Sequence, residues 1–137
     1  MPHTSLIIHF VWATWDRIDM IDETWERPLY AQICHEATRL EASVLALGGT
    51  GNHLHLLVGL KPIIAPAVFI GEIKGSSSFV VNQQKWFGGH FQWQGDYSAF
   101  SVSRWDKPKI IAYVNSQKEH HANGTIKSQL ELPPSKR

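Results

Sequence analysis

The sequence predicts a single α+β domain in which helices pack on an antiparallel sheet, as in ferredoxin-like and RRM-like folds. First, 43% of the 137 residues are hydrophobic and 18% are charged, which is enough apolar material for one core. Second, strand-like stretches alternate with stretches of helical periodicity in the order β-α-β-β-α-β-α. Third, the second and third strand-like stretches lie close enough together to form an antiparallel hairpin.

The first strand and helix are predicted from the opening forty residues. Residues 5–14 are rich in β-branched and aromatic side chains and are mostly apolar on both alternate faces, which is typical of a central strand covered on both sides. Residues 16–23 are polar and turn-like. Residues 24–40 follow helical spacing, with Pro28 expected in the first turn and one apolar face made of Trp25, Leu29, Ile33 and Ala37.

A hairpin and a second helix follow. Residues 43–47 and 53–60 are short apolar strands separated by Gly48-Gly49 and a polar turn. Pro66 then opens a helix that runs to about Lys85, with a loose apolar face made of Val68, Ile73 and Phe79.

The last third of the chain is predicted to end in a helix and a polar tail. Residues 88–103 are aromatic and contain glycine, which indicates short strands or a loop. A helix should follow over residues 107–122, with Asp106 as its N-cap and Asn123-Gly124 as a left-handed end. Residues 1–124 are therefore expected to form the domain, and residues 125–137 a loose polar tail.

Composition narrows the class of protein. The lone cysteine, Cys34, excludes an internal disulfide framework and favours a reducing compartment. No stretch has the length of a membrane span or the layout of a signal peptide, so we expect a soluble cytoplasmic protein with no membrane partner. A formal charge of +1 excludes a strongly basic domain, but it is compatible with a local basic patch that binds nucleic acid.

Two groups of polar residues stand where chemistry is possible. His53 and His55 are two residues apart on a predicted strand, so they project from the same face and are able to share a divalent ion. A pair of polar residues on a half-exposed strand would give the same pattern. On the last predicted helix a polar stripe is formed by Tyr113, Gln117, His120 and His121, which also fits a solvated helix face.

Taken in order, five blocks of this sequence resemble the single-tyrosine HUH (histidine–hydrophobic–histidine) transposases of small bacterial insertion sequences, the IS200-like family. The resemblance covers roughly residues 5–123. The blocks are HFVWAT from His9, GNHLHLLV from Gly51, KGSSS from Lys74, AFSVS from Ala99 and YVNSQKEHH from Tyr113. The chain departs from the family pattern at Asn52, where an aspartate is expected, at Ser116 before Gln117, and at residues 96–98.

The resemblance implies a metal-dependent enzyme that cleaves and rejoins single-stranded DNA with hairpin ends. Tyr113 would be the nucleophile and would form a 5′-phosphotyrosine, without a nucleotide cofactor. His53, His55 and Gln117 would bind Mg²⁺ or Mn²⁺, which suit imidazole and amide-oxygen ligands with open positions. A homodimer is also expected, in which the tyrosine helix acts on its own subunit or on its partner.

Several alternatives stay open at this stage. His120 and His121 compete with Gln117 as the third ligand, Tyr30 and Tyr97 compete with Tyr113, and no residue stands out as the general base. A half-buried, satisfied position is expected for His9, with a supporting role in the site as its alternative. A domesticated relative that still nicks DNA, or a catalytically silent RRM-like module that binds hairpins, would retain much of the same sequence.

Contacts with DNA are predicted less sharply than the catalytic residues. Lys74 with Ser76 to Ser78, and Arg104 with Lys107 and Lys109, offer charges and hydroxyl groups to phosphates, although solvated surfaces would look alike. Unpaired bases would be able to stack on an aromatic set that is more typical of a core or a dimer interface: Trp86, Phe87, Phe91 and Trp93.

Overall fold

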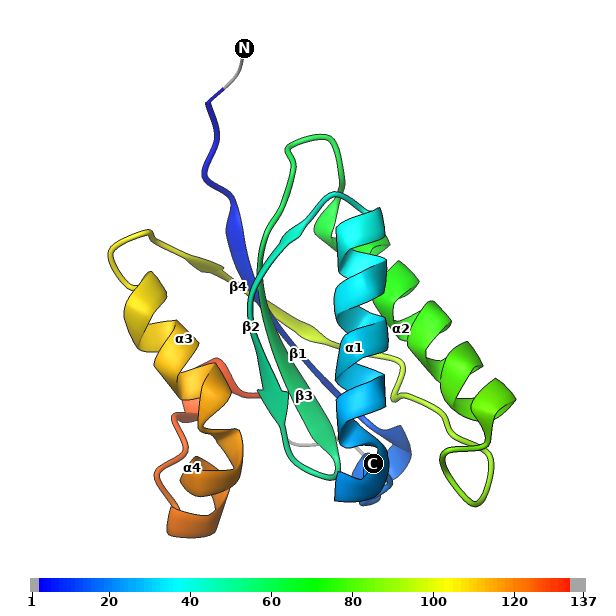
Figure 1. The fold of residues 1–137 in the computed structure, drawn as a ribbon. Helices are drawn as coiled ribbons and strands as arrows, with labels where there is room; N and C mark the ends of the chain where they lie inside the picture. Colours follow the sequence, from blue (N-terminus) through cyan, green and yellow to red (C-terminus); the bar gives the residue numbers. More distant parts are fainter. Residues whose placement is uncertain (1–2, 134–137) are drawn as a thin grey trace.

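A four-stranded antiparallel sheet forms the centre of the computed structural model, which describes residues 3–133. The strand order is β2-β3-β1-β4, with β1 and β3 in the middle (Figure 1). The strands are β1 (Ile7–Ala13), β2 (Ser43–Gly49), β3 (His53–Gly59) and β4 (Ser98–Val102). The predicted α+β class with an antiparallel, ferredoxin-like sheet is confirmed.

Helices lie on both sides of this sheet. α1 (Glu23–Arg39) and α2 (Pro66–Gln84) lie together on one face, and α3 (Lys107–Asn115) lies on the other, over β2 and β3 (Figure 1). α4 (Gln117–Asn123) follows α3, and two short 3₁₀ turns are η1 (Trp15–Arg17) and η2 (Ser128–Leu130). No helix in residues 3–133 combines the length and the apolar character needed to span a bilayer.

Successive side chains along β1 and β3 point to opposite faces of the sheet, one covered by α1 and α2 and the other by α3. Phe10 and Trp12 on β1, like Leu54 and Leu56 on β3, belong to the large core beneath α1 and α2. The opposite face carries the histidines of both strands and a smaller apolar cluster that packs under α3, made of Ile7, Ala46, Leu57, Ile110 and Val114. The prediction that the first strand is covered on both faces is therefore confirmed.

α1 follows its prediction closely but begins one residue earlier. The side chain of Asp22 accepts a hydrogen bond from the Thr24 backbone N–H at 2.7 Å and so caps the helix. Because the helix begins at Glu23, Pro28 lies in the second turn and not in the first. In the second turn it removes one backbone hydrogen-bond donor of the helix. The predicted apolar face is buried as expected.

The apolar face predicted for α2 is wrong, although the bounds of the helix are right within a residue. Val68 and Phe79 are 56% and 63% exposed, and only Ile73 of the three is buried. The helix instead buries residues that recur every four positions, with Ile70 beside them: Phe69, Ile73, Ser77 and Val81. The hydroxyl of Ser77 breaks the apolar pattern in the sequence, but it accepts a hydrogen bond from the Trp93 indole at 2.9 Å.

The continuous helix predicted for residues 107–122 is broken at Ser116. This residue has φ −114° and ψ 26°, outside helical values, and it separates α3 from α4. Asp106 stands at the N-cap position but makes no capping bond with its side chain. Gly124 takes the predicted left-handed conformation, with φ 69°, and ends α4.

The segment expected to be a loose tail returns to the sheet. Residues 125–133 include η2, and the guanidinium of Arg17 donates a hydrogen bond to the Pro133 carbonyl. Glu131 has a side chain that is only 12% exposed. Residues 134–137 lie outside the described part of the chain.

Candidate active site

The site lies between β3 and the helix carrying Tyr113. His53 and His55 point from β3 toward α3, and the rings of His55 and Tyr113 meet edge to face with centroids 5.9 Å apart. All three side chains are buried. The absence of a side chain at Gly48 on β2 allows α3 to pack closely against the sheet, since a Cβ added there would lie 2.2 Å from the Val114 carbonyl oxygen. The predicted histidine pair and tyrosine are thus brought together within one chain.

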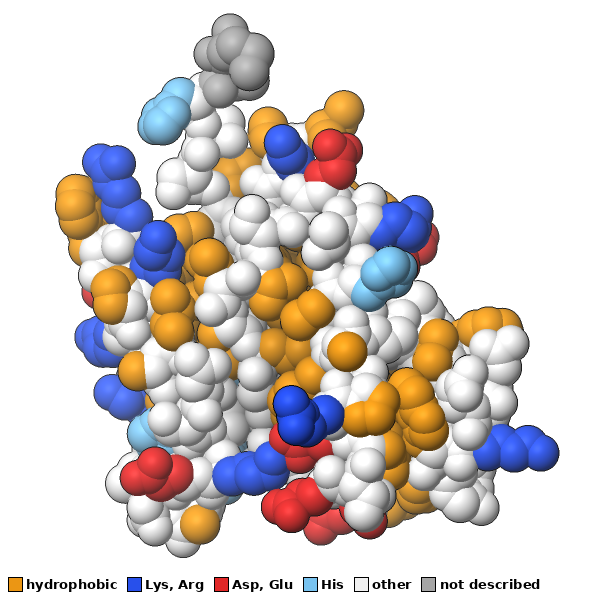
Figure 2. Space-filling model, viewed as in Figure 1, with side chains coloured by type: hydrophobic (Ala, Val, Ile, Leu, Met, Phe, Trp, Pro, Cys, Tyr) orange, Lys and Arg blue, Asp and Glu red, His pale blue; other side chains and the backbone are white. Residues whose placement is uncertain are grey.

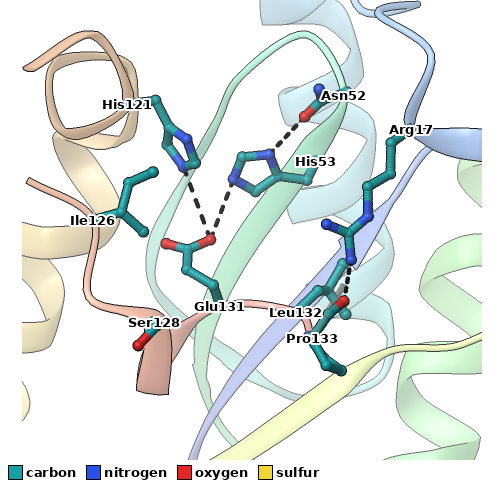
Figure 3. Close-up of a pocket in the computed structure, with 9 residues that line it drawn as sticks. All are labelled: Arg17, Asn52, His53, His121, Ile126, Ser128, Glu131, Leu132 and Pro133. Atoms are coloured by element: carbon teal, nitrogen blue, oxygen red, sulfur yellow. Dashed lines mark hydrogen bonds and ion pairs between the residues drawn. The ribbon is translucent and has the colours of Figure 1, made fainter. Parts of the chain in front are cut away.

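Glu131 is the member of the site that the sequence does not reveal. Its Oε1 lies 3.0 Å from His55 Nε2, 3.4 Å from His53 Nε2 and 3.8 Å from His121 Nε2, and its Oε2 accepts a hydrogen bond from the Tyr113 hydroxyl. The convergence of His53, His121 and Glu131 is visible in Figure 3. Glu131 stands in a polar stretch without periodicity, so no local pattern singles it out.

Gln117 lies beside the same point. Its Oε1 is 3.4 Å from His53 Nε2 and 3.1 Å from His121 Nε2, while its amide nitrogen donates to the Tyr113 carbonyl at 3.1 Å. His120, one of the two competing ligands, is directed elsewhere: it packs against the Tyr113 ring and its Nδ1 contacts Thr125 Oγ1 at 2.8 Å.

Asn52 and Thr50 fix the orientation of His53. Nδ1 of His53 lies 2.8 Å from Asn52 Oδ1 and 2.9 Å from Thr50 Oγ1, and the Thr50 hydroxyl itself donates to Asn52 Oδ1. Both oxygens therefore offer lone pairs to Nδ1, so neutral His53 carries its proton there and presents the lone pair of Nε2 to the site. An aspartate is not needed at position 52, because the amide oxygen of Asn52 supplies the acceptor.

His55 is oriented in turn by a histidine of β1. His9 Nε2 lies 2.8 Å from His55 Nδ1, and both side chains are fully buried. His9 is thus more deeply buried than the half-buried position expected. Burial, together with the neighbouring His55, lowers the pKa of His9 to about 3, so the ring is neutral. Burial also lowers the pKa of His55, against the opposing effect of Glu131.

The residues present fit a divalent metal ion. Nε2 of His53 lies 3.4 Å from Gln117 Oε1 and 3.4 Å from Glu131 Oε1. With the His53 proton on Nδ1, all three atoms offer lone pairs to the same point, an arrangement that a cation stabilises. One ligand atom from each of His53, His55, His121 and Glu131 lies within 4.8 Å of the others. Ligands on opposite sides of one ion, at bond lengths of about 2.0–2.3 Å, would be separated by a similar distance.

Tyr113 is held in its protonated form. Its hydroxyl donates to Glu131 and accepts a hydrogen bond from the Lys127 backbone N–H at 3.0 Å. Burial, reinforced by the hydrogen bond to Glu131, raises the pKa of Tyr113 to about 12. The competing tyrosines lie apart from the histidines, since Tyr30 stands on α1 and Tyr97 packs against Phe10 of the large core.

The side chains predicted to contact DNA are not gathered at the site. Lys74 and Ser76 lie on α2, across the sheet from Tyr113; the Lys74 ammonium donates to the Gln94 carbonyl at 2.6 Å, and the Ser76 hydroxyl bonds within the helix. Arg104 precedes α3 and lies over the Trp105 ring. The aromatic set of residues 86–93 packs in or against the large core.

A pocket of about 410 Å³ opens beside the histidines. Figure 3 shows residues from several segments around it, including Arg17 from η1, Asn52 and His53 at the start of β3, and Glu131. Nothing in the sequence singles out Arg17, because an isolated arginine in a polar turn gives no signal. The pocket therefore brings the Arg17 guanidinium near His53, His121 and Glu131, three side chains with atoms that could bind a metal ion.

Comparison with known proteins places this arrangement among transposases. The family model described as "Transposase IS200 like" matches residues 2–117. A candidate transposase from Deinococcus radiodurans R1 has a similar structure, with a TM-score of 0.65 at 24% identity over 82% of this chain and 91% of that one. A REP-associated tyrosine transposase bound to a REP hairpin also has a TM-score of 0.65, at 13% identity over 92% of this chain and 74% of that one. No curated protein matches the sequence.

Proposed function

This chain belongs to the IS200-like transposase family, and from that premise we propose that it cuts and rejoins single-stranded DNA through Tyr113 with a divalent metal ion. The observation that carries the proposal is the meeting of three groups in one place. The Tyr113 hydroxyl, the Nε2 atoms of His53 and His55, and the Glu131 carboxylate converge although they come from three separate segments. A module that only bound nucleic acid would not need this set.

The ion would be held by His53, His55 and Gln117, with Glu131 as an additional anionic ligand. Mg²⁺ or Mn²⁺ suits a donor set that mixes imidazole with oxygen ligands and leaves positions open. When bound, such an ion supplies Lewis-acid stabilisation of negative charge on a phosphodiester. Asn52 would support the site by keeping the Nε2 lone pair of His53 directed inward.

Tyr113 would act as the nucleophile. Its hydroxyl oxygen forms a bond to a backbone phosphorus while the bond from phosphorus to the 3′-oxygen breaks, leaving a 5′-phosphotyrosine and a strand that ends in a 3′-hydroxyl. The phenolic proton passes to an acceptor, and Glu131 Oε2 already accepts the hydrogen bond from that hydroxyl. Attack by another 3′-hydroxyl reverses the step and joins strands without a nucleotide cofactor.

The proposed substrate is single-stranded DNA that carries a hairpin. The REP-associated relative is described as bound to a REP hairpin, which supports a hairpin substrate here. Basic side chains gather along the edge of the molecule formed by α3, as Figure 2 shows. Arg104 precedes this helix, and Lys107 and Lys109 lie in its first turn. We propose that this edge and Arg17 contact phosphates, whereas the bonded ammonium of Lys74 makes it a weaker candidate.

The tyrosine helix acts within its own subunit in this proposal. Tyr113 reaches His55 and Glu131 of the same chain, so one subunit contains the proposed catalytic set. The homodimer expected from the resemblance stays a prediction, and the proposed chemistry does not depend on it.

The proposal is tested with labelled hairpin DNA taken from the genomic flanks of the gene. Incubation with Mn²⁺ should give a covalent protein–DNA band on a denaturing gel, and EDTA should abolish it. Tyr113→Phe should bind the hairpin without forming the band, while Tyr97→Phe is the matched control that keeps it. Tight hairpin binding by the wild type without any covalent band would favour the binding module instead.

A further inference from the structure

We propose that His9 is a positioning residue for the metal site: it is the hydrogen-bond partner that allows His55 to present a free Nε2 lone pair to the ion. This inference rests on the proposed function, because it concerns the ion assigned there. It adds a residue of β1 that is not among the residues lining the pocket.

The rings of His9 and His55 form a buried, hydrogen-bonded pair. His9 Nε2 lies 2.8 Å from His55 Nδ1, the ring centroids are 5.0 Å apart, and both side chains are 0% exposed. The other nitrogen of His9, Nδ1, has no hydrogen-bond partner among the described residues. The Phe100 ring packs beside His9 with its centroid 5.7 Å away.

When an ion is bound to His55, the Nδ1 atom of His55 needs a hydrogen-bond acceptor beside it. If Nε2 of His55 binds an ion, the proton of the neutral ring must lie on Nδ1, and a hydrogen bond from that N–H to a neighbouring acceptor fixes the orientation of the ring. His9 Nε2 is the atom in position to accept that hydrogen bond. His53 has the equivalent support from Asn52 and Thr50, so each histidine of the pair has a partner at its Nδ1.

Without the ion, His9 and His55 exchange the roles of hydrogen-bond donor and acceptor. His55 Nε2 lies 3.0 Å from Glu131 Oε1 and can donate to the carboxylate, and His9 Nε2–H then donates to His55 Nδ1. When an ion binds, a proton leaves His55 Nε2, the proton of His9 Nε2 passes to His55 Nδ1, and one proton adds at His9 Nδ1, a nitrogen that has no acceptor among the described residues. Both rings stay neutral and no net proton is released. A partner at position 9 must therefore both donate and accept.

Two variants of similar length separate hydrogen bonding from packing. His9→Gln keeps a group that can donate or accept, whereas His9→Met fills similar space and can do neither. The affinity for Mn²⁺ is measured without DNA, from the electron paramagnetic resonance signal of the free ion. The protonated nitrogen of His55 is identified by NMR of protein labelled with ¹⁵N-histidine, with and without Zn²⁺.

We expect His9→Met to weaken Mn²⁺ binding by about 10- to 100-fold, and His9→Gln to stay within about threefold of the wild type. In the Zn²⁺-loaded wild type the His55 proton should reside on Nδ1. Equal Mn²⁺ affinity in wild type and His9→Met would overturn the inference, as would equal losses in both variants, because packing alone would then explain them. Failure of the wild type to bind Mn²⁺ also overturns it, whereas Mn²⁺ binding without DNA cleavage overturns only the proposed function.

Discussion

The close approach of α3 to β2 makes Gly48 a sensitive position for Tyr113. In Gly48→Ala the new Cβ would lie 2.2 Å from the carbonyl oxygen of Val114. Val114 directly follows the proposed nucleophile, Tyr113. Ordinary contact requires α3 to withdraw by about 1 Å, and a displacement of that size can cost about 100-fold in rate when it moves a reacting group. Overpacking of this kind also lowers the free energy of unfolding by about 1–3 kcal/mol.

The rate of covalent adduct formation in a single turnover, at saturating hairpin DNA and Mn²⁺, measures this effect. Gly75→Ala is the matched control, because nothing lies within 4 Å of the added Cβ in the middle of α2. That control should keep the wild-type rate and gain about 0.5–1 kcal/mol in stability. A wild-type rate in Gly48→Ala, with the protein folded, would refute the argument that Gly48 sets the position of Tyr113.

Three further predictions follow from the side chains around the site. Asn52→Leu should weaken Mn²⁺ binding by about 10- to 100-fold, because Nδ1 of His53 loses the nearer of its two acceptors, while Asn52→Asp should keep the wild-type affinity. Electron paramagnetic resonance measures both affinities, and unchanged binding in Asn52→Leu would contradict the role given to Asn52. Glu131→Gln and Gln117→Ala should each lower Mn²⁺ affinity at least about tenfold in the same assay, so a wild-type value in either variant would remove that residue from the ligand set. In EDTA, the free energy of unfolding should fall as the pH drops below about 6.5. Buried His9 has a pKa of about 3 and stays neutral, whereas the same histidine in the unfolded chain becomes protonated. The loss from His9 alone should reach about 2 kcal/mol at pH 5 in urea denaturation, and His9→Gln, in which this contribution is absent, should show a correspondingly smaller fall.

Local patterns in the sequence predict much of the fold and half of the site. The period of two on a strand suffices to place His53 and His55 on one face, opposite Leu54 and Leu56, and the structure confirms it. The same reasoning fails on α2, because Ser77 interrupts the buried face and Phe79 lies at an exposed position despite its apolar side chain. Tertiary packing, here the hydrogen bond from Trp93 to Ser77, decides which face is covered.

The remaining half of the site depends on contacts that are distant in sequence. Glu131 meets His55 across 76 residues, and the polar stretch around it resembles a solvated tail. The break at Ser116 is equally hidden, since serine is compatible with a helix interior. The sequence favours a satisfied, half-buried position for His9, because a lone histidine on an apolar strand does not reveal its partner. Only the fold shows that this partner is His55.

Mapping the residue that becomes linked to DNA tests the central claim most directly. The wild-type protein is incubated with hairpin DNA and Mn²⁺, digested with a nuclease and a protease, and analysed by mass spectrometry. The account predicts a nucleotide attached through phosphate to Tyr113, absent when EDTA is added. A nucleotide on Tyr30 or Tyr97, or cleavage of the DNA without any linked peptide, would contradict it.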